Sequence, residues 1–255
     1  LFENSFHDYS RMSGILPGWT LKNYIRILSD SFYLEISLRT IKLALMTSGV
    51  TLLLGYPIAL YLCVASPRQR AWIILLVLSP LLISVIVRTF GWLILLGANG
   101  LVDNTLKLFG WSVGSLLHTE GAVIVGLANV LLPFMVLSIS TALQNIDPSI
   151  NLAASSLGAS PLKVFVKVTV PLSLPGVLAG LLIVFSLASS SFVTPALLGG
   201  SNYKVLSSLI YEQAMVLQNW PFSAAFAVVL MLIVLAILAV QRQAIEGGKY
   251  KVVFH

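Results

Sequence analysis

Five long apolar blocks dominate this sequence, and they restrict its possible folds more than any other feature. They lie at about 37–64, 72–96, 121–143, 174–193 and 222–241. A helix needs roughly 20 apolar residues to cross a hydrocarbon core about 30 Å thick, so each block can span a bilayer. The chain is 58% hydrophobic and only 9% charged, whereas soluble domains carry about 25% charged residues. We therefore predict an integral membrane protein with five spans.

The blocks are predicted to be α-helices rather than strands of a barrel. A chain in lipid satisfies its own backbone hydrogen bonds, either within helices or around a closed barrel. Barrel strands are about ten residues long and alternate in polarity, and the stretch 224–240 does not alternate. Asn219 suits the N-cap of the last helix and Pro221 its first turn. The predicted fold class is all-α.

Basic residues between the blocks predict which side of the membrane each loop faces. Three segments on one side carry seven basic residues, namely Arg68, Arg70, Lys163, Lys167, Arg242, Lys249 and Lys251. The loops on the other side carry only Lys107 and Lys204. The excess places the first group in the cytoplasm. We therefore divide the chain into an external segment 1–35, a membrane domain 36–241 and a cytoplasmic tail 242–255.

The cytoplasmic loop 144–173 has the pattern of a docking element. Asp147 suits an N-cap, Pro148 the first helical position and Gly158 the end of the helix. One face of this helix carries Ile150, Ala153, Ala154 and Leu157. A turn and a second short amphipathic stretch follow. This arrangement suits insertion into a partner's groove. A helix lying on the membrane surface is the alternative.

This loop resembles the EAA motif of ABC importer permeases, which runs Glu-Ala-Ala, three residues, Gly, nine residues, then Ile-x-Leu-Pro. The matching positions hold Ala153, Ala154, Gly158, Val168, Val170 and Pro171 at the same spacing. Leu152 stands where the family usually has Glu. The resemblance implies that residues 148–160 form a coupling helix for an ATP-binding subunit. The residues expected to make that contact are Leu152, Ala153, Ala154, Gly158, Ala159, Ser160 and Pro171.

Further segments resemble the spermidine/putrescine-type branch of these permeases: 87–92, 99–101, 130–134 and 192–200. Together with the loop, the resemblance covers about residues 35–240. It implies the MetI-like fold, with a core of about five helices and often one more helix at the N-terminus, which would precede Leu1.

The implied function is that of a permease subunit in an ATP-driven, binding-protein-dependent importer of the bacterial inner membrane. Such a subunit moves its solute by alternating access. The implied partners are two copies of an ATP-binding subunit, a second homologous permease, a periplasmic or lipid-anchored solute-binding protein and membrane lipid. ATP and Mg would bind the partner subunits, with no cofactor in this chain.

The motifs of several other functions are absent from the sequence. No Lys is followed by Ser or Thr, so a Walker A motif is impossible. There is no His-Glu-x-x-His zinc motif. We predict neither an enzyme nor a metal site, and we attribute the net charge of +6 to membrane topology rather than to nucleic acid. A secondary transporter or channel is the alternative class, but none of the nine acidic residues lies deep in a block.

Arg88 is the charged residue that lies well inside a block, and it is the first of the residues predicted to line a substrate pathway. A charge there costs roughly 2.5–3.5 kcal/mol on insertion scales, so it should face the bundle interior or a watery cavity. It is either a pathway residue or a structural partner of carbonyls or of the opposing permease. The other predicted pathway residues are Phe90, Trp92, Phe192, Thr194, Tyr211 and Glu212. The aromatic ones could instead be interfacial anchors.

The substrate follows less directly from these residues. A polyamine site should offer carboxylates and aromatic faces. Against a polyamine stand Arg39, Lys42 and Arg88, which we expect to repel cations. The resemblance nevertheless implies a small charged organic solute of polyamine type, and an amino-acid or opine-like anion is the alternative. The apolar stretch 203–218, which contains Glu212, lies either at the interface or within the mouth of the bundle.

Overall fold

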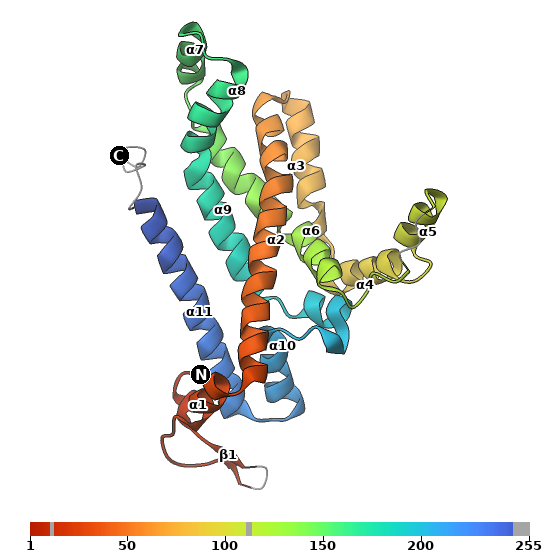
Figure 1. The fold of residues 1–255 in the computed structure, drawn as a ribbon, viewed down its shortest axis with the longest axis vertical. Helices are drawn as coiled ribbons and strands as arrows, with labels where there is room; N and C mark the ends of the chain where they lie inside the picture. The colour runs from red at the N-terminus through yellow and green to blue at the C-terminus, as the bar shows by residue number, and fades with distance from the viewer. Residues whose placement is uncertain (11–12, 111–113, 247–255) are drawn as a thin grey trace. The chain divides into compact units, whose positions relative to one another are not determined.

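The computed structural model describes residues 1–10, 13–110 and 114–246, which fold almost entirely into helices (Figure 1). The strands β1 (Tyr9–Ser10) and β2 (Gly14–Ile15) pair antiparallel near the N-terminus. The helices are α1 (Lys22–Ser29), α2 (Ser31–Val64), α3 (Pro67–Leu82), α4 (Val85–Leu96), α5 (Leu101–Leu108), α6 (Glu120–Gln144), α7 (Pro148–Ser156), α8 (Pro161–Val164), α9 (Val170–Ser190), α10 (Leu206–Tyr211) and α11 (Trp220–Glu246).

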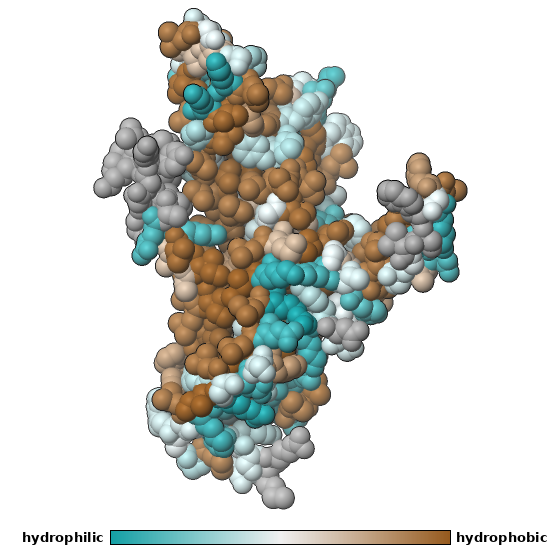
Figure 2. Space-filling view, viewed as in Figure 1, coloured by the Kyte–Doolittle hydropathy of each residue, from teal (hydrophilic) through white to brown (hydrophobic). Residues whose placement is uncertain are grey.

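Five helical segments of the described chain are long and apolar enough to cross a membrane. They are Ser31–Val64, Val85–Leu108, Glu120–Gln144, Pro161–Ser190 and Trp220–Gln241. Figure 2 shows a mostly apolar surface over α11, where Met231, Leu232, Leu235 and Val240 are exposed. Apolar side chains in such a band suit contact with lipid. The predicted all-α membrane fold is confirmed.

The second predicted span is wrong in its bounds. The block 72–96 is not one helix, because α3 ends at Leu82 and α4 begins at Val85. Pro80 lies in the last turn of α3, where it lacks an N–H and its ring crowds the preceding turn. The apolar segment long enough to span here is Val85–Leu108, which combines α4 and α5.

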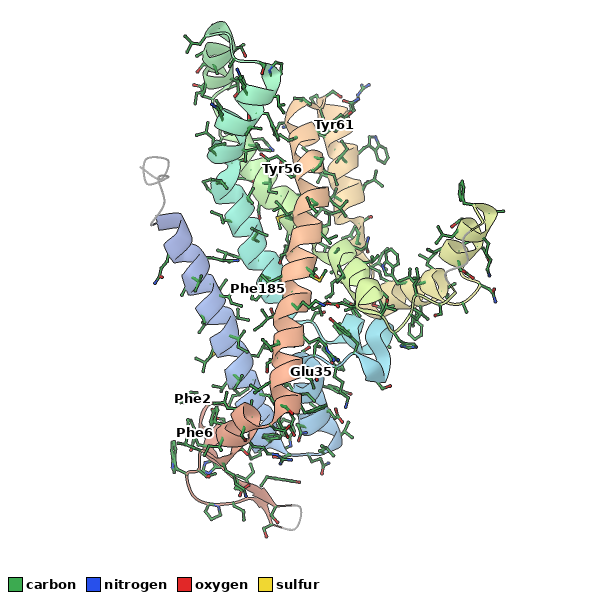
Figure 3. The ribbon with its side chains drawn as sticks, in the orientation of Figure 1. Phe2, Phe6, Glu35, Tyr56, Tyr61 and Phe185 are labelled. Carbon is green, nitrogen blue, oxygen red and sulfur yellow. The ribbon has the colours of Figure 1, made fainter. Side chains whose placement is uncertain are left out.

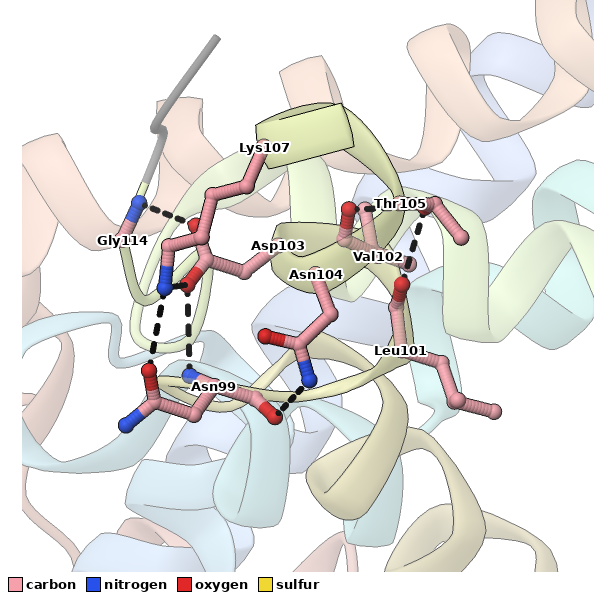
Figure 4. A network of polar contacts seen from close by, with 8 residues as sticks. All are labelled: Asn99, Leu101, Val102, Asp103, Asn104, Thr105, Lys107 and Gly114. Atoms are coloured by element: carbon pink, nitrogen blue, oxygen red, sulfur yellow. Dashed lines mark hydrogen bonds and ion pairs between the residues drawn. The ribbon is translucent and has the colours of Figure 1, made fainter. Parts of the chain in front are cut away.

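A turn at 97–100 separates α4 from α5, and one carboxylate organises it (Figure 4). Asp103 is 3% exposed. Its side chain accepts hydrogen bonds from the backbone N–H groups of Asn99, at 3.3 Å, and Gly114, at 3.0 Å, and pairs with Lys107 at 2.6 Å. Asn99 has a positive φ of 59°. A Cβ at Gly100 would lie 2.5 Å from two carbonyl oxygens of α4. The Asn99-Gly100 sequence therefore fits a close backbone approach that larger residues would block.

The fourth predicted span also has a different start. The helical segment begins at Pro161 rather than at 174, and it runs through α8, a π-helical turn at Phe165–Thr169 and α9. Val170 donates its N–H to the carbonyl of Phe165, five residues back. The next residue, Pro171, has no N–H, so the wider turn accommodates a position that an α-helix would leave without a donor. The predicted second amphipathic stretch is the first part of this long helix.

The chain forms two compact units, each assembled from separated segments. One unit comprises Leu1–Met46, Ile83–Leu127 and Ser186–Ala236, and the other comprises Thr47–Leu82, Ala128–Phe185 and Ile237–His255. The first contains the N-terminal segment and both loops predicted to be external. The second contains the loops 66–71 and 144–173, which the sequence predicts to be cytoplasmic. The side of the membrane that each segment faces stays a prediction.

An aromatic core holds the first unit together. The ring of Tyr33 in α2 meets Phe222 and Phe226 of α11 edge-on, at 5.6 and 5.1 Å between centroids. Leu206 and Leu209 of α10 pack into the same core. α10 is thus packed into the core of this unit, whereas Met215 and Val216, later in the same stretch, are exposed. At the start of α11, the side chain of Asn219 accepts a hydrogen bond from the backbone N–H of Phe222 at 3.1 Å, which confirms the predicted N-cap.

Glycine contacts between α6 and α9 hold the second unit together. A Cβ on Gly176 would meet the Ala142 side chain and would lie 2.6 Å from the Ser138 carbonyl oxygen. A Cβ on Gly180 would lie 2.7 Å from the sulfur of Met135. Small residues four apart allow two helix backbones to approach closely in a membrane. The pair Gly176 and Gly180 therefore marks the packing seam of α9 on α6.

Substitutions at this seam should lower the free energy of unfolding, by an amount that depends on what the new side chain meets. Gly176→Ala should lower the free energy of unfolding by about 1–3 kcal/mol, because the new methyl meets backbone that cannot move aside. Gly180→Ala should cost less, since the flexible Met135 side chain can shift. Gly49→Ala, in α2, is the control, because its Cβ would meet nothing within 4 Å. Thermal unfolding in detergent would measure all three, and equal midpoints would contradict the assigned seam.

Candidate functional sites

The start of the predicted coupling helix is capped as the sequence predicts. The Asp147 side chain accepts a hydrogen bond from the backbone N–H of Ser149 at 2.8 Å, and Pro148 occupies the first turn of α7. The Ser149 N–H holds the pKa of the Asp147 carboxyl below its usual value, so the cap stays ionised near neutral pH. A negative charge at this end also suits the helix dipole.

The end of α7 is closed by a Schellman turn centred on Gly158. The Gly158 N–H donates to the carbonyl of Ser155 at 3.0 Å, and the Ala159 N–H donates to that of Ala154 at 3.2 Å. Gly158 has φ +81°, which is the left-handed conformation that this motif requires. The turn directs the chain into α8, for which Ser160 is the N-cap residue. The prediction that glycine ends this helix is confirmed.

The seven predicted coupling residues lie in α7, in the turn that follows it and at the start of α9. No residue of α7 is buried. Leu152 is 68% exposed and Leu157 is 89% exposed. Ala153 and Ser160 are exposed, whereas Ala154, Ala159 and Pro171 are half-buried. Figure 1 shows α7 and α8 projecting beyond the ends of α6 and α9. This helix therefore presents large apolar side chains that the described residues leave exposed, and its contact with another subunit stays a prediction.

Two cavities lie beside α7 within the same unit. One, of about 680 Å³, is lined by Asp147 and Ile150 together with Pro175 and Gly176 of α9. The other, of about 600 Å³, is lined by Pro148 and Asn151 together with residues of neighbouring helices, among them Cys63, Arg70 and Phe165. The helix is thus held at its ends and by few side contacts, which leaves its exposed face available.

Part of the predicted substrate pathway is assembled in the first unit. The ring of Phe192 stacks on that of Tyr211, with centroids 4.3 Å apart and planes 22° from parallel. The neighbouring Glu212 forms an ion pair with Lys204 at 2.7 Å. Thr194 is buried, and a Cβ on Gly126 would lie 2.9 Å from its methyl group. Thr194 therefore packs its methyl group against α6.

The remaining pathway residues lie on α4. Phe90 is 52% exposed, whereas Arg88 and Trp92 are half-buried. This helix packs against the π-helical turn Pro195–Gly199, which follows Thr194 directly. The structure therefore brings Phe192 and Tyr211 into direct contact and places Arg88, Phe90 and Trp92 on a separate helix. Whether any of them contacts the solute stays a prediction.

The first unit contains a charged groove that the sequence did not predict. It has a volume of about 680 Å³ and is lined by Glu35, Leu38, Arg39, Lys42, Glu120 and Tyr203. Figure 2 shows hydrophilic surface along the part of α2 where Figure 3 labels Glu35. We call this feature the α2 groove. Its helical residues recur at three- and four-residue spacing, so one face of α2 supplies four of the six side chains.

Ion pairs in the α2 groove neutralise the two bases that we expected to repel cations there, Arg39 and Lys42. Arg39 pairs with Glu35 at 2.6 Å, and Lys42 pairs with Glu120 at 2.8 Å. The local charge is therefore balanced. Glu35 and Arg39 are four residues apart, so their pairing was readable from the sequence. Lys42 and Glu120 are 78 residues apart, and no local pattern could reveal that they meet.

Tyr203 closes one side of the α2 groove. It is 8% exposed, and the Arg39 guanidinium lies 5.2 Å from the centre of its ring. Burial, and secondarily the nearby Glu120 carboxylate, raise the pKa of the Tyr203 hydroxyl well above its usual value. The hydroxyl therefore stays protonated at physiological pH and remains a hydrogen-bond donor. It makes no well-aligned hydrogen bond within the described residues.

One short motif outside these sites also needs a structural explanation. Residues 110–114 read Gly-Trp-Ser-Val-Gly, which has the spacing of the serine hydrolase nucleophile elbow. That elbow joins a strand to a helix. Here the segment follows helix α5, and residues 114–119 continue without regular structure. Ser112 lies outside the described residues. The structural context therefore does not support a catalytic serine.

The Schellman turn gives a conformational test at Gly158. A Cβ there would meet nothing within 4 Å, so any effect of substitution comes from the backbone. Gly158→Val should destabilise the end of α7 by about 1–2 kcal/mol, whereas Gly158→Asn should cost less because Asn tolerates positive φ. Hydrogen exchange at the backbone amides of α7 measures the difference. Equal protection in both variants would contradict the assigned turn.

Comparison with known proteins places most of the chain in one family. Residues 46–245 match the model of the binding-protein-dependent transport system inner membrane component. The spermidine/putrescine transport system permease protein PotB of Escherichia coli is 32% identical over 228 residues, covering 89% of this chain and 82% of PotB. The molybdenum transport system permease protein ModB of Mycobacterium bovis is 31% identical over 203 residues, covering 80% of this chain and 75% of ModB.

Solved structures agree on the fold. A bacterial ABC transporter involved in the import of the acidic polysaccharide alginate superposes with a TM-score of 0.71 at 20% identity, covering 89% of this chain and 84% of that chain. The family match, the five apolar segments and this likeness all agree with the resemblance that the loop 144–173 indicates. The chain therefore belongs to the binding-protein-dependent transport system inner membrane components, as a multi-pass permease subunit of the bacterial inner membrane.

Proposed function

We propose that this permease subunit carries a polyamine-type cation into the cytoplasm, driven by ATP hydrolysis on a separate subunit. The permease role follows from the family. The solute class is supported by the likeness to PotB over 89% of this chain and by the neutralised bases of the α2 groove. A similar level of identity to ModB means that overall likeness alone does not select the solute.

The proposed assembly contains two ATP-binding subunits, a second related permease and an external solute-binding protein. The family description names binding-protein-dependent transport. One transporter with this fold has been solved in complex with a ligand-bound periplasmic protein. Charged side chains of the α2 groove within a span are exposed in the single chain. Such groups should face water or protein rather than lipid, which supports a second membrane subunit.

The observation that carries the proposal is the exposure of two leucines, one in α7 and one at its C-cap. Leu152 and Leu157 project from a short capped helix at the end of the second unit, in a segment predicted to be cytoplasmic. Leaving two leucines uncovered in water forgoes roughly 1.5–3 kcal/mol for each, compared with burying them. The small residues Ala153 and Ala154 beside them let the helix enter a groove closely. We therefore assign α7 as the element that couples this chain to the ATP-binding subunit.

The Leu152 side chain explains how the family's usual Glu can be absent. An exposed leucine supplies apolar contact area where a glutamate would supply a polar contact. Leu152→Glu restores the family pattern and should be tolerated. The docking surface would then depend more on Leu157 and on the close approach that Ala154 permits.

Substitutions in α7 should uncouple the transporter without preventing membrane insertion. Ala154→Trp should overfill the docking groove at a cost of about 1–3 kcal/mol. Leu157→Ala should weaken binding by removing an exposed anchor, and Ser156→Ala is the matched control on the same helix. The measurement is co-purification of the ATP-binding subunit, together with solute-stimulated ATP hydrolysis. Wild-type values for a normally inserted double variant, Ala154→Trp with Gly158→Val, would contradict the assignment.

The solute class is tested with the assembled transporter and its binding protein in liposomes. Uptake of radiolabelled putrescine or spermidine should require ATP on the cytoplasmic side of the transporter, which is the inside of the vesicle. Uptake should saturate as the solute concentration rises. Glutamate and molybdate serve as anionic comparisons at the same concentration. Uptake of either anion in place of the polyamines would overturn the solute class and leave the permease role intact.

A further inference from the structure

The α2 groove combines features that a purely structural ion-pair cluster does not need. Lys42 lies within the candidate span Ser31–Val64, yet its side chain is 60% exposed. Glu35 is 68% exposed on the same face of α2. Charged groups at such positions in membrane helices face a watery cavity or another protein subunit. The groove is therefore open to whatever occupies that space.

Two buried polar atoms in the α2 groove have no hydrogen-bond partner among the described residues. One is Oε1 of Glu120, whose other oxygen accepts from Lys42, and the second is the hydroxyl of Tyr203. Buried polar groups in folded proteins are nearly always paired, because leaving one unpaired is costly. The Glu120 carboxylate lies close enough to the Tyr203 hydroxyl to raise its pKa, yet neither buried atom has a well-aligned partner. A carboxylate oxygen can only accept, so a donor that reached both atoms would complete the pair. This requirement favours a ligand with N–H groups over an anion.

The other residues of the α2 groove also suit a cation. The Tyr203 ring already holds the Arg39 guanidinium at 5.2 Å, so its face is placed to attract positive charge. The Lys42 ammonium has the same chemistry as a primary amine of a polyamine. It keeps Glu120 neutralised while the groove is empty, which avoids leaving a partly buried carboxylate unpaired. Because Lys42 is largely exposed, it can swing away when another ammonium arrives.

We propose that the α2 groove is a cation subsite of the permease, in which a primary ammonium group of the solute donates to Glu120 and Tyr203 and displaces Lys42. This inference rests on the proposed function, since it names where a polyamine-type cation is held during transport. Glu35 offers a second carboxylate on the same face for a second ammonium group. Lys42 and Arg39 act as internal placeholders rather than as a barrier to cations.

If Lys42 is a placeholder for the solute, substitutions of Lys42 and of Glu120 should change the apparent KM for putrescine in opposite directions. Glu120→Gln removes the acceptor charge, so the apparent KM for putrescine should rise about tenfold or more. Lys42→Met removes the internal competitor, so the apparent KM should fall. A pair that only stabilised the fold would impair uptake in the same direction in both variants. Uptake by the assembled transporter in liposomes, with unstimulated ATP hydrolysis measured alongside, distinguishes the two cases.

A charge-swap variant tests whether misfolding, rather than loss of the subsite, lowers putrescine uptake. The double variant Lys42→Glu with Glu120→Lys can re-form the ion pair, so its thermal stability should return toward that of the wild type. Putrescine uptake should nevertheless stay low, because the buried acceptor has become a donor. Recovery of both stability and uptake in this variant would overturn the proposal. Tyr203→Phe, which removes only the hydroxyl, should raise the KM by a smaller factor.

Occupancy can be measured without transport. Leu38 is 67% exposed and lines the α2 groove. In a Cys63→Ser background, Leu38→Cys should react with water-soluble methanethiosulfonates, and millimolar spermidine should slow that reaction. Glutamate at the same concentration should not. Protection by glutamate alone, or by neither compound, would overturn the cation subsite.

The outcomes separate this inference from the proposed function. If the wild-type transporter imports neither putrescine nor spermidine, the proposed solute class fails before any variant is compared. If it imports them and Glu120→Gln matches the wild type, the subsite is wrong and the solute class stands. Parallel impairment of Glu120→Gln and Lys42→Met would likewise refute the subsite alone.

Discussion

The absence of water in the hydrocarbon core is the constraint on which the rest of this structure depends. Every backbone N–H and C=O in a span must find a partner within the protein. The helices are interrupted where proline or glycine permits it and where the surroundings supply an alternative bond. At 97–100 the Asp103 carboxylate accepts from two backbone N–H groups. At Phe165–Thr169 a wider helical turn precedes Pro171.

The same constraint makes the positions of charged side chains informative about function. In the first unit, two ion pairs keep the α2 groove balanced while leaving polar atoms within reach of a ligand. In the second unit, α7 exposes leucines rather than charges. The groove therefore favours contact with a charged solute, whereas α7 favours docking on a protein. A permease subunit that couples ATP hydrolysis elsewhere to solute movement needs both kinds of surface.

The sequence predicted local features well because their signals are local. The cap at Asp147, the turn at Gly158 and the N-cap at Asn219 all follow from residue type and short spacing. The predicted bounds of the second and fourth spans were wrong because hydropathy does not register the end of α3 at Leu82, or a helix that extends through Lys163 and Lys167. The α2 groove was missed because it joins residues from α2, α6 and the segment after Pro195–Gly199. Only the folded chain brings those side chains together.

The central claim is that α7 is the contact through which a separate ATP-binding subunit drives this permease. Site-specific cross-linking in the intact transporter tests it most directly. A photoreactive or thiol cross-linker placed at Leu157, in a Cys63→Ser background, should capture the ATP-binding subunit. The yield should change when nucleotide is added. The same cross-linker at Phe109, which is 81% exposed in the other unit, should not capture that subunit. Capture from Phe109 but not from Leu157 would contradict the account.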